Sequence, residues 1–177
     1  MAECVAAGVF VDAGFCDCLF YCSLQKRLVY VPSLAIDGIL YISPMLDCYR
    51  GEIVSLAMDT NKKKELCIKT VCDAYKLRKP EAGIIIHSDG GSQYTSRKYK
   101  KTLGSFHAIQ SMSGTDKCYD NARMESWFAT LKKEKLYKLD TAHMTVEEVK
   151  KEVWRYTFAY YNTVRITTVT EDGFPPS

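Results

Sequence analysis

The sequence lacks any long hydrophobic run. No apolar stretch reaches the roughly 18 residues that a helix needs to cross a bilayer. No basic segment precedes the apolar N-terminus, as it would in a secretory signal. Internal repeats and low-complexity tracts are absent as well. We therefore expect a globular domain of the cytoplasm, with reduced thiols and no membrane partner.

The cysteines lack the spacing of a metal knot or of a disulfide framework. Four of the eight fall early in the chain, without a C-x2-C pair or a following pair of histidines, and the other four are scattered. The first group is Cys4, Cys16, Cys18 and Cys22, and the second is Cys48, Cys67, Cys72 and Cys118. The sequence therefore favours neither a structural zinc site nor a fold held by disulfides.

The composition is that of a single globular domain. The chain has 177 residues, of which 47% are hydrophobic and 25% are charged, so it can bury one sizeable core. The formal net charge is only +3, but residues 93–138 contain ten Lys or Arg against four acidic residues, a local excess of +6. This excess suits a polyanionic partner, and it equally suits a solvated surface.

From residue 38 onward, the sequence alternates between strand and helix patterns. Two β-rich apolar runs around a turn predict a hairpin, and a charged amphipathic segment that ends at Lys79-Pro80 predicts a surface helix. Thr145 and Glu148 form a capping box for a C-terminal helix. The expected strands are 39–47, 53–59, 84–86 and 108–114, and the expected helices are 62–77, 96–106, 119–137 and one that opens at 145. This order indicates an α/β architecture.

Residues 1–35 do not follow this pattern. They are rich in Cys, Val and Phe, and they show neither a two-residue nor a 3.6-residue hydrophobic period. We therefore expect two parts, an atypical N-terminal segment at 1–35 and an α/β domain at 36–177.

The predicted strand at 84–86 leads into a polar cluster that contains Asp89. A carboxylate in this position lies at the carboxyl edge of the sheet, where open α/β folds bind their ligands. Taken alone, Asp89 would more simply cap the Gly90-Gly91 turn. Glu125 follows after 35 intervening residues, on a predicted helix. Two carboxylates that meet from a strand end and a helix face form a site for a hard cation such as Mg²⁺.

The helix that carries Glu125 also carries lysines. Lys132 lies seven residues after Glu125 and therefore on the same face of the helix, where it can bind the phosphate backbone of a nucleic acid. Lys133 and Lys135 add positive potential, or they serve only as solubilising residues at a helix end.

Three strings of the sequence resemble a known family. They are HSDGGSQYTS at 87–96, QSMSGTDKCYDNARMESWFATLKKE at 110–134 and RYTFAYYNTVRI at 155–166. They are similar to the integrase-type catalytic core of bacterial insertion-sequence transposases of the orfB type, which share the DDE active site with retroviral integrases. The resemblance runs from about residue 40 to residue 176. It implies a ribonuclease H-like fold, in which helices flank a mixed five-stranded sheet on both sides.

The resemblance implies metal-dependent cleavage and transfer of DNA strands. Asp89 and Glu125 match two of the family's catalytic acids and would bind Mg²⁺ or Mn²⁺, one ion activating water or a DNA 3′-hydroxyl and another stabilising the leaving oxygen. The implied DNA contacts are Lys132, Lys133, Gln93, Tyr94 and Asn121, of which Asn121 is alternatively a helix cap. The implied partners are the element ends, the target DNA and further copies of the chain in the DNA complex. The implied location is the bacterial cytoplasm, at the nucleoid.

The chain departs from the family at the first catalytic aspartate. The family places this residue in a Thr-Asp string upstream of a Leu-Asp pair, which is here Leu46-Asp47. The corresponding position, 18 residues before Asp47, is Val29, and no Thr-Asp pair lies near it. Asp47 is the acid expected nearest to the position of the missing aspartate, and we expect it to act as a supporting metal ligand. Two carboxylates hold two cations poorly, because ligand charge must offset the repulsion between the ions.

Three interpretations follow from this departure. The first is a decayed or truncated transposase, which lacks the first strand motif and the last residues of the core and whose residues 1–35 come from a shifted reading frame or a spurious start. The second is a catalytically inactive DNA-binding or oligomerisation module derived from a transposase. The third is a general nuclease of the same fold, which the family-specific strings do not favour.

Overall fold

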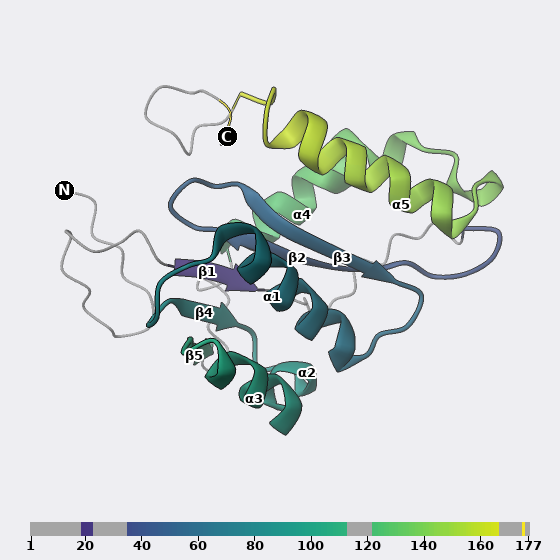
Figure 1. The fold of residues 1–177 in the computed structure, drawn as a ribbon. Coiled ribbons are helices and arrows are strands. Elements are labelled where there is room, and N and C mark those ends of the chain that lie inside the picture. The colour runs from purple at the N-terminus through teal and green to yellow at the C-terminus, as the bar shows by residue number, and fades with distance from the viewer. Residues whose placement is uncertain (1–18, 23–34, 113–121, 167–174, 176–177) are drawn as a thin grey trace.

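A mixed five-stranded sheet forms the centre of the molecule (Figure 1). The computed structural model describes residues 19–22, 35–112, 122–166 and 175. In the spatial order β3-β2-β1-β4-β5, the first three strands are mutually antiparallel neighbours, and β4 and β5 run parallel to β1. The strands are β1 (Leu19–Cys22), β2 (Tyr41–Asp47), β3 (Ile53–Asp59), β4 (Ile85–Ser88) and β5 (Ile109–Met112).

Helices cover both faces of this sheet (Figure 1). One layer consists of α1 (Lys64–Arg78), α2 (Ser92–Thr95) and α3 (Arg97–Ser105), and the other consists of α4 (Ala122–Glu134) and α5 (Val146–Arg155). Two 3₁₀ turns join α4 to α5, and a π-helix continues α5: these are η3 (Leu136–Lys138), η4 (Thr141–His143) and η5 (Tyr156–Tyr161). None of the helices described is both long and apolar enough to span a membrane. The layers confirm the expected α/β architecture.

Alternate residues of the strands face the two helical layers. On β2, Ile42 and Leu46 are buried in one cluster with Trp127 of α4. Met45, between them in the pleat, is buried in a second cluster with Val71 of α1. This is the two-residue period of a strand with both faces covered. The sheet therefore separates two cores, one beneath α4 and α5 and one beneath α1 and α3.

The N-terminal segment contributes a strand that the sequence does not predict. β1 lies at the centre of the sheet, where Phe20 pairs with Asp47 of β2 on one side and with Ile86 of β4 on the other. The segment 1–35, which the sequence sets apart as atypical, therefore contributes residues 19–22 to the sheet. A strand of four residues is too short to show a hydrophobic period, so only its neighbours in the sheet reveal it.

The other elements lie close to their expected positions. β2 and β3 form the expected hairpin, whose turn contains Gly51 with φ +74°. α1 ends at Lys79, which adopts the left-handed conformation with φ 45°, and Pro80 prevents the helix from continuing. The expected helix at 119–137 is observed from Ala122, and the residues just before it lie outside the described part of the chain.

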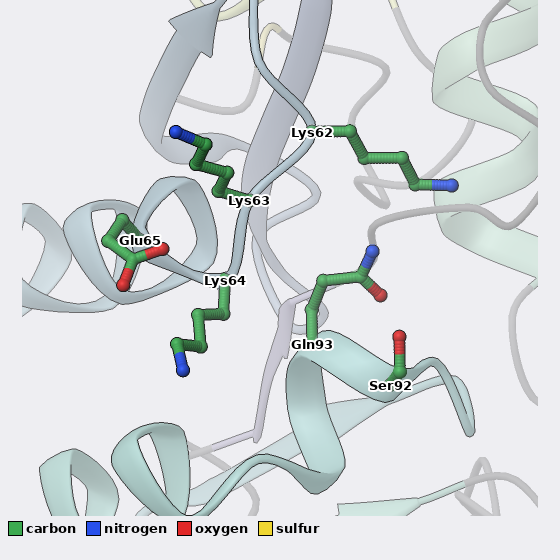
Figure 2. Close-up of a pocket in the computed structure, with 6 residues that line it drawn as sticks. All are labelled: Lys62, Lys63, Lys64, Glu65, Ser92 and Gln93. Carbon is green, nitrogen blue, oxygen red and sulfur yellow. The ribbon is translucent and has the colours of Figure 1, made fainter.

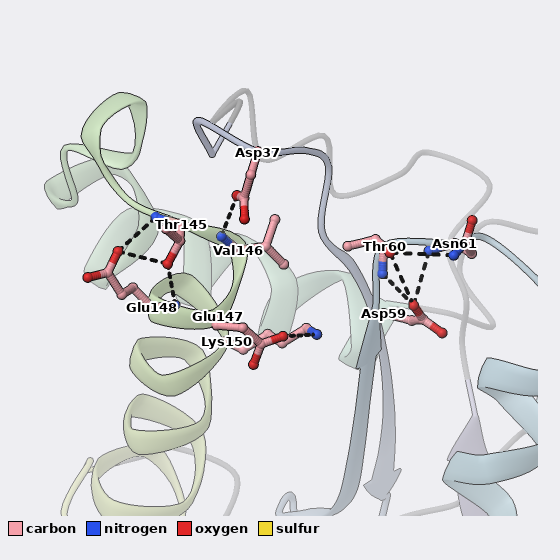
Figure 3. A network of polar contacts seen from close by, with 9 residues as sticks. All are labelled: Asp37, Asp59, Thr60, Asn61, Thr145, Val146, Glu147, Glu148 and Lys150. Carbon is pink, nitrogen blue, oxygen red and sulfur yellow. Dashed lines mark hydrogen bonds and ion pairs between the residues drawn. The ribbon is translucent and has the colours of Figure 1, made fainter.

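Polar contacts fix the start of α5 (Figure 3). The Glu148 N–H donates to the Thr145 hydroxyl at 3.3 Å, and the Thr145 N–H donates to the Glu148 carboxylate at 2.8 Å, which confirms the capping box. The Val146 N–H donates to the Asp37 carboxylate at 2.7 Å, which ties the segment before β2 to α5. The bond from the Thr145 N–H lowers the pKa of Glu148. The ionised Glu148 carboxylate therefore contributes its full stabilisation above the ordinary pKa of glutamate. This stabilisation is lost as the pH falls through the lower pKa that Glu148 has in the folded protein.

We expect Thr145→Ala to lower the free energy of unfolding by about 0.5–2 kcal/mol, because the Glu148 N–H loses its side-chain acceptor at the helix start. Urea denaturation at neutral pH measures the effect. Thr102→Ala is the matched control, since Thr102 lies inside α3 and its hydroxyl bonds back to Lys98. Equal losses in the two variants would contradict the capping role.

Candidate active site

Asp89 directly follows β4 and opens the turn to α2. Its Oδ1 accepts the backbone N–H of Gly91 at 2.8 Å, so the simple turn-capping role is present. An ionised carboxylate offers about four acceptor positions, and one bond to a backbone N–H is compatible with binding a cation. The side chain is half-buried. Asp89 is therefore held in place at the edge of the sheet and is partly open to solvent.

β4 presents alternate side chains to the two helical layers. Ile84 and Ile86 belong to the core beneath α1. The intervening positions, Ile85 and His87, therefore face the opposite layer. β4 ends at Ser88, so Asp89 lies one residue past the strand, in the turn to α2.

Glu125 lies in the first turn of α4 and is exposed. The sheet-facing side chains of this helix are buried, namely Met124, Trp127, Phe128 and Leu131. Arg123, in the same turn as Glu125, donates to the Cys48 carbonyl and fixes the start of α4 against the turn between β2 and β3. Glu125 is therefore carried by the helical layer of α4, whereas Asp89 lies just past the end of β4.

The central strand supplies no third acid within the described residues. β1 consists of Leu, Phe, Tyr and Cys. Tyr21 pairs with His87, two residues before Asp89, so the end of β1 lies beside the strand end that carries Asp89. Val29, the position found by counting from Asp47, lies outside the described residues. In the part of the chain that the structure describes, no three His, Cys, Asp or Glu side chains gather in a metal-binding group.

Asp47 caps the hairpin turn. Its Oδ1 accepts the N–H groups of Tyr49 and Arg50 at 2.8 and 3.1 Å. In the sheet, Asp47 is level with Ile86, across the intervening β1. Two strand spacings and three residues separate its backbone from that of Asp89, which is about 14 Å. This separation argues against Asp47 as a ligand of an ion held by Asp89.

The expected DNA contacts divide into surface and core residues. Lys133 is exposed, whereas Gln93 and Lys132 are half-buried, and Lys132 lies about 10 Å along the helix axis from Glu125. Tyr94 is fully buried and packs edge-on against Tyr99, with ring centroids 5.2 Å apart. The expectation that Tyr94 contacts DNA is therefore wrong, because its ring fills the core beneath α3. Asn121 lies outside the described residues.

The sequence analysis missed a basic hollow next to the Asp89 turn (Figure 2). Its volume is about 380 Å³, and its lining residues come from the start of α1 and from α2: Lys62, Lys63, Lys64, Glu65, Ser92 and Gln93. The run of three consecutive lysines is visible in the sequence. Its position opposite α2 depends on tertiary packing, which no local pattern records.

Comparison with known proteins identifies the family of this chain. The integrase core domain family matches residues 24–118, more than half of the chain. The chain belongs to the integrase core domain family. It is 36% identical over 140 residues to the transposase for insertion sequence element IS904 of Lactococcus lactis subsp. lactis, covering 78% of this chain and 53% of that protein. It is 34% identical over 144 residues to the putative transposase InsK for IS150 of Escherichia coli, covering 81% and 50%.

This integrase core spans about half the length of the curated relatives it matches. Among solved structures, it resembles the HTLV-2 integrase catalytic core domain in complex with magnesium, with a TM-score of 0.58 and 14% identity over 90% of this chain and 93% of that one. This similarity confirms the expected ribonuclease H-like fold of the retroviral integrase type.

The family match begins inside the segment that composition sets apart. Residues 24–35 match the integrase core, although they lack a hydrophobic period. The matched range therefore includes Val29, the position 18 residues before Asp47.

Proposed function

We propose that this integrase core cuts and joins DNA strands in the transposition of an insertion element, with Asp89 and Glu125 as its catalytic carboxylates. The proposal is supported by the position of Asp89 just past the end of β4 and of Glu125 in the first turn of α4, in a chain of the integrase core family. A strand end and a helix face can supply carboxylates to one metal ion from two directions, and the ion in turn binds the phosphodiester.

Asp89 and Glu125 fit a single Mg²⁺ or Mn²⁺ ion. Proteins bind Mg²⁺ through one or two carboxylates, completed by waters and substrate phosphates, and these two side chains supply that number. A bound ion would polarise the phosphodiester and activate water or a DNA 3′-hydroxyl for in-line attack. Lys132, on the same helix as Glu125, would hold a neighbouring phosphate, and Lys133 would add positive potential. The half-buried Gln93 would contact the DNA beside Asp89.

We propose that the activity is reduced relative to that of a complete transposase. β1 contributes no carboxylate, so a second ion would lack a ligand on the central strand. A shifted reading frame or a spurious start over residues 1–35 would account for this loss. Translation of the encoding DNA in the other two frames tests the idea, and it fails if neither frame yields a Thr-Asp string before residue 40.

The proposed partners follow from the same chemistry. They are the DNA ends of the element, the target DNA and further copies of the chain in the DNA complex. The site of action would be the bacterial cytoplasm, where the nucleoid lies.

The direct test is cleavage of duplexes that carry the element ends, in the presence of Mg²⁺ or Mn²⁺. We expect Asp89→Asn and Glu125→Gln each to lower the cleavage rate by at least about a hundredfold, since each removes a ligand of the ion. Asp140→Asn is the control, because Asp140 is exposed and pairs only locally with His143. Cleavage that persists in Asp89→Asn would contradict the proposal.

A second candidate function is an inactive DNA-binding or assembly module. The absence of an acid from β1 favours it. DNA binding by the wild-type chain without any metal-dependent cleavage would support this module over the enzyme.

A further inference from the structure

We propose that the hollow between the starts of α1 and α2 binds the sugar-phosphate backbone of the DNA strand that continues from the scissile bond. This inference rests on the proposed function and adds to it a site for the flanking strand. The lining residues offer three ammonium groups, one hydroxyl and one amide. These groups match phosphate oxygens, which accept hydrogen bonds and carry negative charge.

The shape of the hollow supports a strand-like ligand. Figure 2 shows Lys62 and Lys64 extending to different sides of the chain at the start of α1, and the amide of Gln93 reaching from α2 toward Lys62. The hollow is lined from two segments that face one another, residues 62–65 and 92–93. A backbone lying between them could present one phosphate to Lys62 and the next to Lys64.

The charge of the hollow is strongly positive. Its one acid, Glu65, forms an ion pair with Lys98 at 3.2 Å. Among the described residues, none of Lys62, Lys63 and Lys64 forms an ion pair. The lysines are half-buried or exposed, so their side chains are accessible to a ligand. DNA carries one negative charge per about 3.4 Å along each strand, and three neighbouring ammonium groups complement that density.

The start of α1 adds to this potential. Lys63 is the N-cap residue of α1, and its side chain makes no capping hydrogen bond. The Glu65 N–H bonds to the Glu65 carboxylate and the Leu66 N–H bonds to the Lys63 carbonyl. The start of this fifteen-residue helix therefore contributes its dipole, which favours an anion, more than free N–H groups.

The proposed catalytic carboxylate lies near Gln93, which lines the hollow. A Cβ built on Gly91 would lie 2.8 Å from Asp89 Oδ1 and 3.1 Å from Gln93 Oε1. The two side chains therefore approach the same point above Gly91, one from the catalytic side and one from the hollow. A strand whose scissile phosphate lies at Asp89 would pass Gln93 next and then enter the hollow.

The test compares two pairs of substitutions in the full chain. Lys62→Gln with Lys64→Gln removes two charges from the hollow. The matched control, Lys138→Gln with Lys151→Gln, removes two exposed charges from η3 and α5, in the layer on the other side of the sheet. Affinity for a single-stranded and a duplex oligonucleotide is measured against KCl concentration, with EDTA present so that no cleavage occurs.

We expect the hollow variant to reduce the slope of log affinity against log salt by about 1.4 for the single strand and about 1.8 for the duplex, and the control to leave it unchanged. Gln93→Glu should weaken binding in the same direction. Equal reductions in both pairs, or none in the hollow pair, would overturn the proposal. Binding is measured without metal, so it is independent of cleavage. If the hollow variant lowers the salt slope but the chain never cleaves DNA, only the proposed function is contradicted. If the chain cleaves DNA but the hollow variant leaves the salt slope unchanged, only the role of the hollow is contradicted.

Discussion

Gly91→Ala is expected to lower metal-dependent DNA cleavage by about a hundredfold while the protein stays folded. The new Cβ would lie 2.8 Å from Asp89 Oδ1, closer than folded proteins allow, so the carboxylate must turn away. A displacement of about 1 Å in a catalytic group can reduce a rate by about two orders of magnitude. Gly91 therefore acts as a positioning residue, because its missing side chain leaves room for the carboxylate.

The backbone at Gly91 tolerates alanine, which separates this effect from misfolding. Its φ is −62° and its ψ is 146°, values that any residue adopts. We expect the free energy of unfolding to change by less than about 1 kcal/mol. Gly90→Ala is the matched control, since a Cβ there meets nothing within 4 Å. If cleavage rates fall equally in the two alanine variants, Gly91 does not position Asp89.

Asn162→Ala is expected to lower the free energy of unfolding by about 2–5 kcal/mol, the largest stability effect among these predictions. The Asn162 amide accepts the Ile53 N–H at 3.0 Å and donates to the Ile53 carbonyl at 3.0 Å. Both bonds are buried, and β3 is an edge strand of the sheet. Alanine would leave two buried backbone groups unsatisfied, and each costs about 1–3 kcal/mol.

Thr163→Ala is the control for this stability effect. Thr163 is the next residue, but it is exposed, and its hydroxyl bonds only to the Ala159 carbonyl. Chemical denaturation of both variants gives the comparison. Similar unfolding free energies for Asn162→Ala and the wild type would show that the side chain does not hold the edge of β3.

Three features of the fold are predictable from short stretches of the sequence. The hairpin of β2 and β3, the end of α1 at Lys79-Pro80 and the capping box of α5 all depend on residues within a few positions of one another. β1 has no such signal, because four residues between two partner strands are specified by their pairing. The central position of β1 in the sheet therefore cannot be predicted from the local sequence and is seen only in the three-dimensional structure.

In the candidate site too, some features are predictable from the local sequence and others depend on the tertiary structure. Asp89 and Glu125 stand out through the strings around them, and the structure adds that one lies just past β4 and the other in the first turn of α4. Tyr94 was misplaced because a polar aromatic residue next to a catalytic string gives no sign of its burial. The role of Asp47 depended on strand register, which the sequence does not specify.

Binding of Mn²⁺ followed by electron paramagnetic resonance tests the central claim, that Asp89 and Glu125 hold one ion together. The samples are the wild type, Asp89→Asn, Glu125→Gln and the double variant, each with an element-end duplex. We predict that each single substitution weakens binding at least about tenfold and that the double variant is scarcely worse than either, as for two ligands of a shared ion. Wild-type affinity in either single variant, or losses that simply add, would contradict the account.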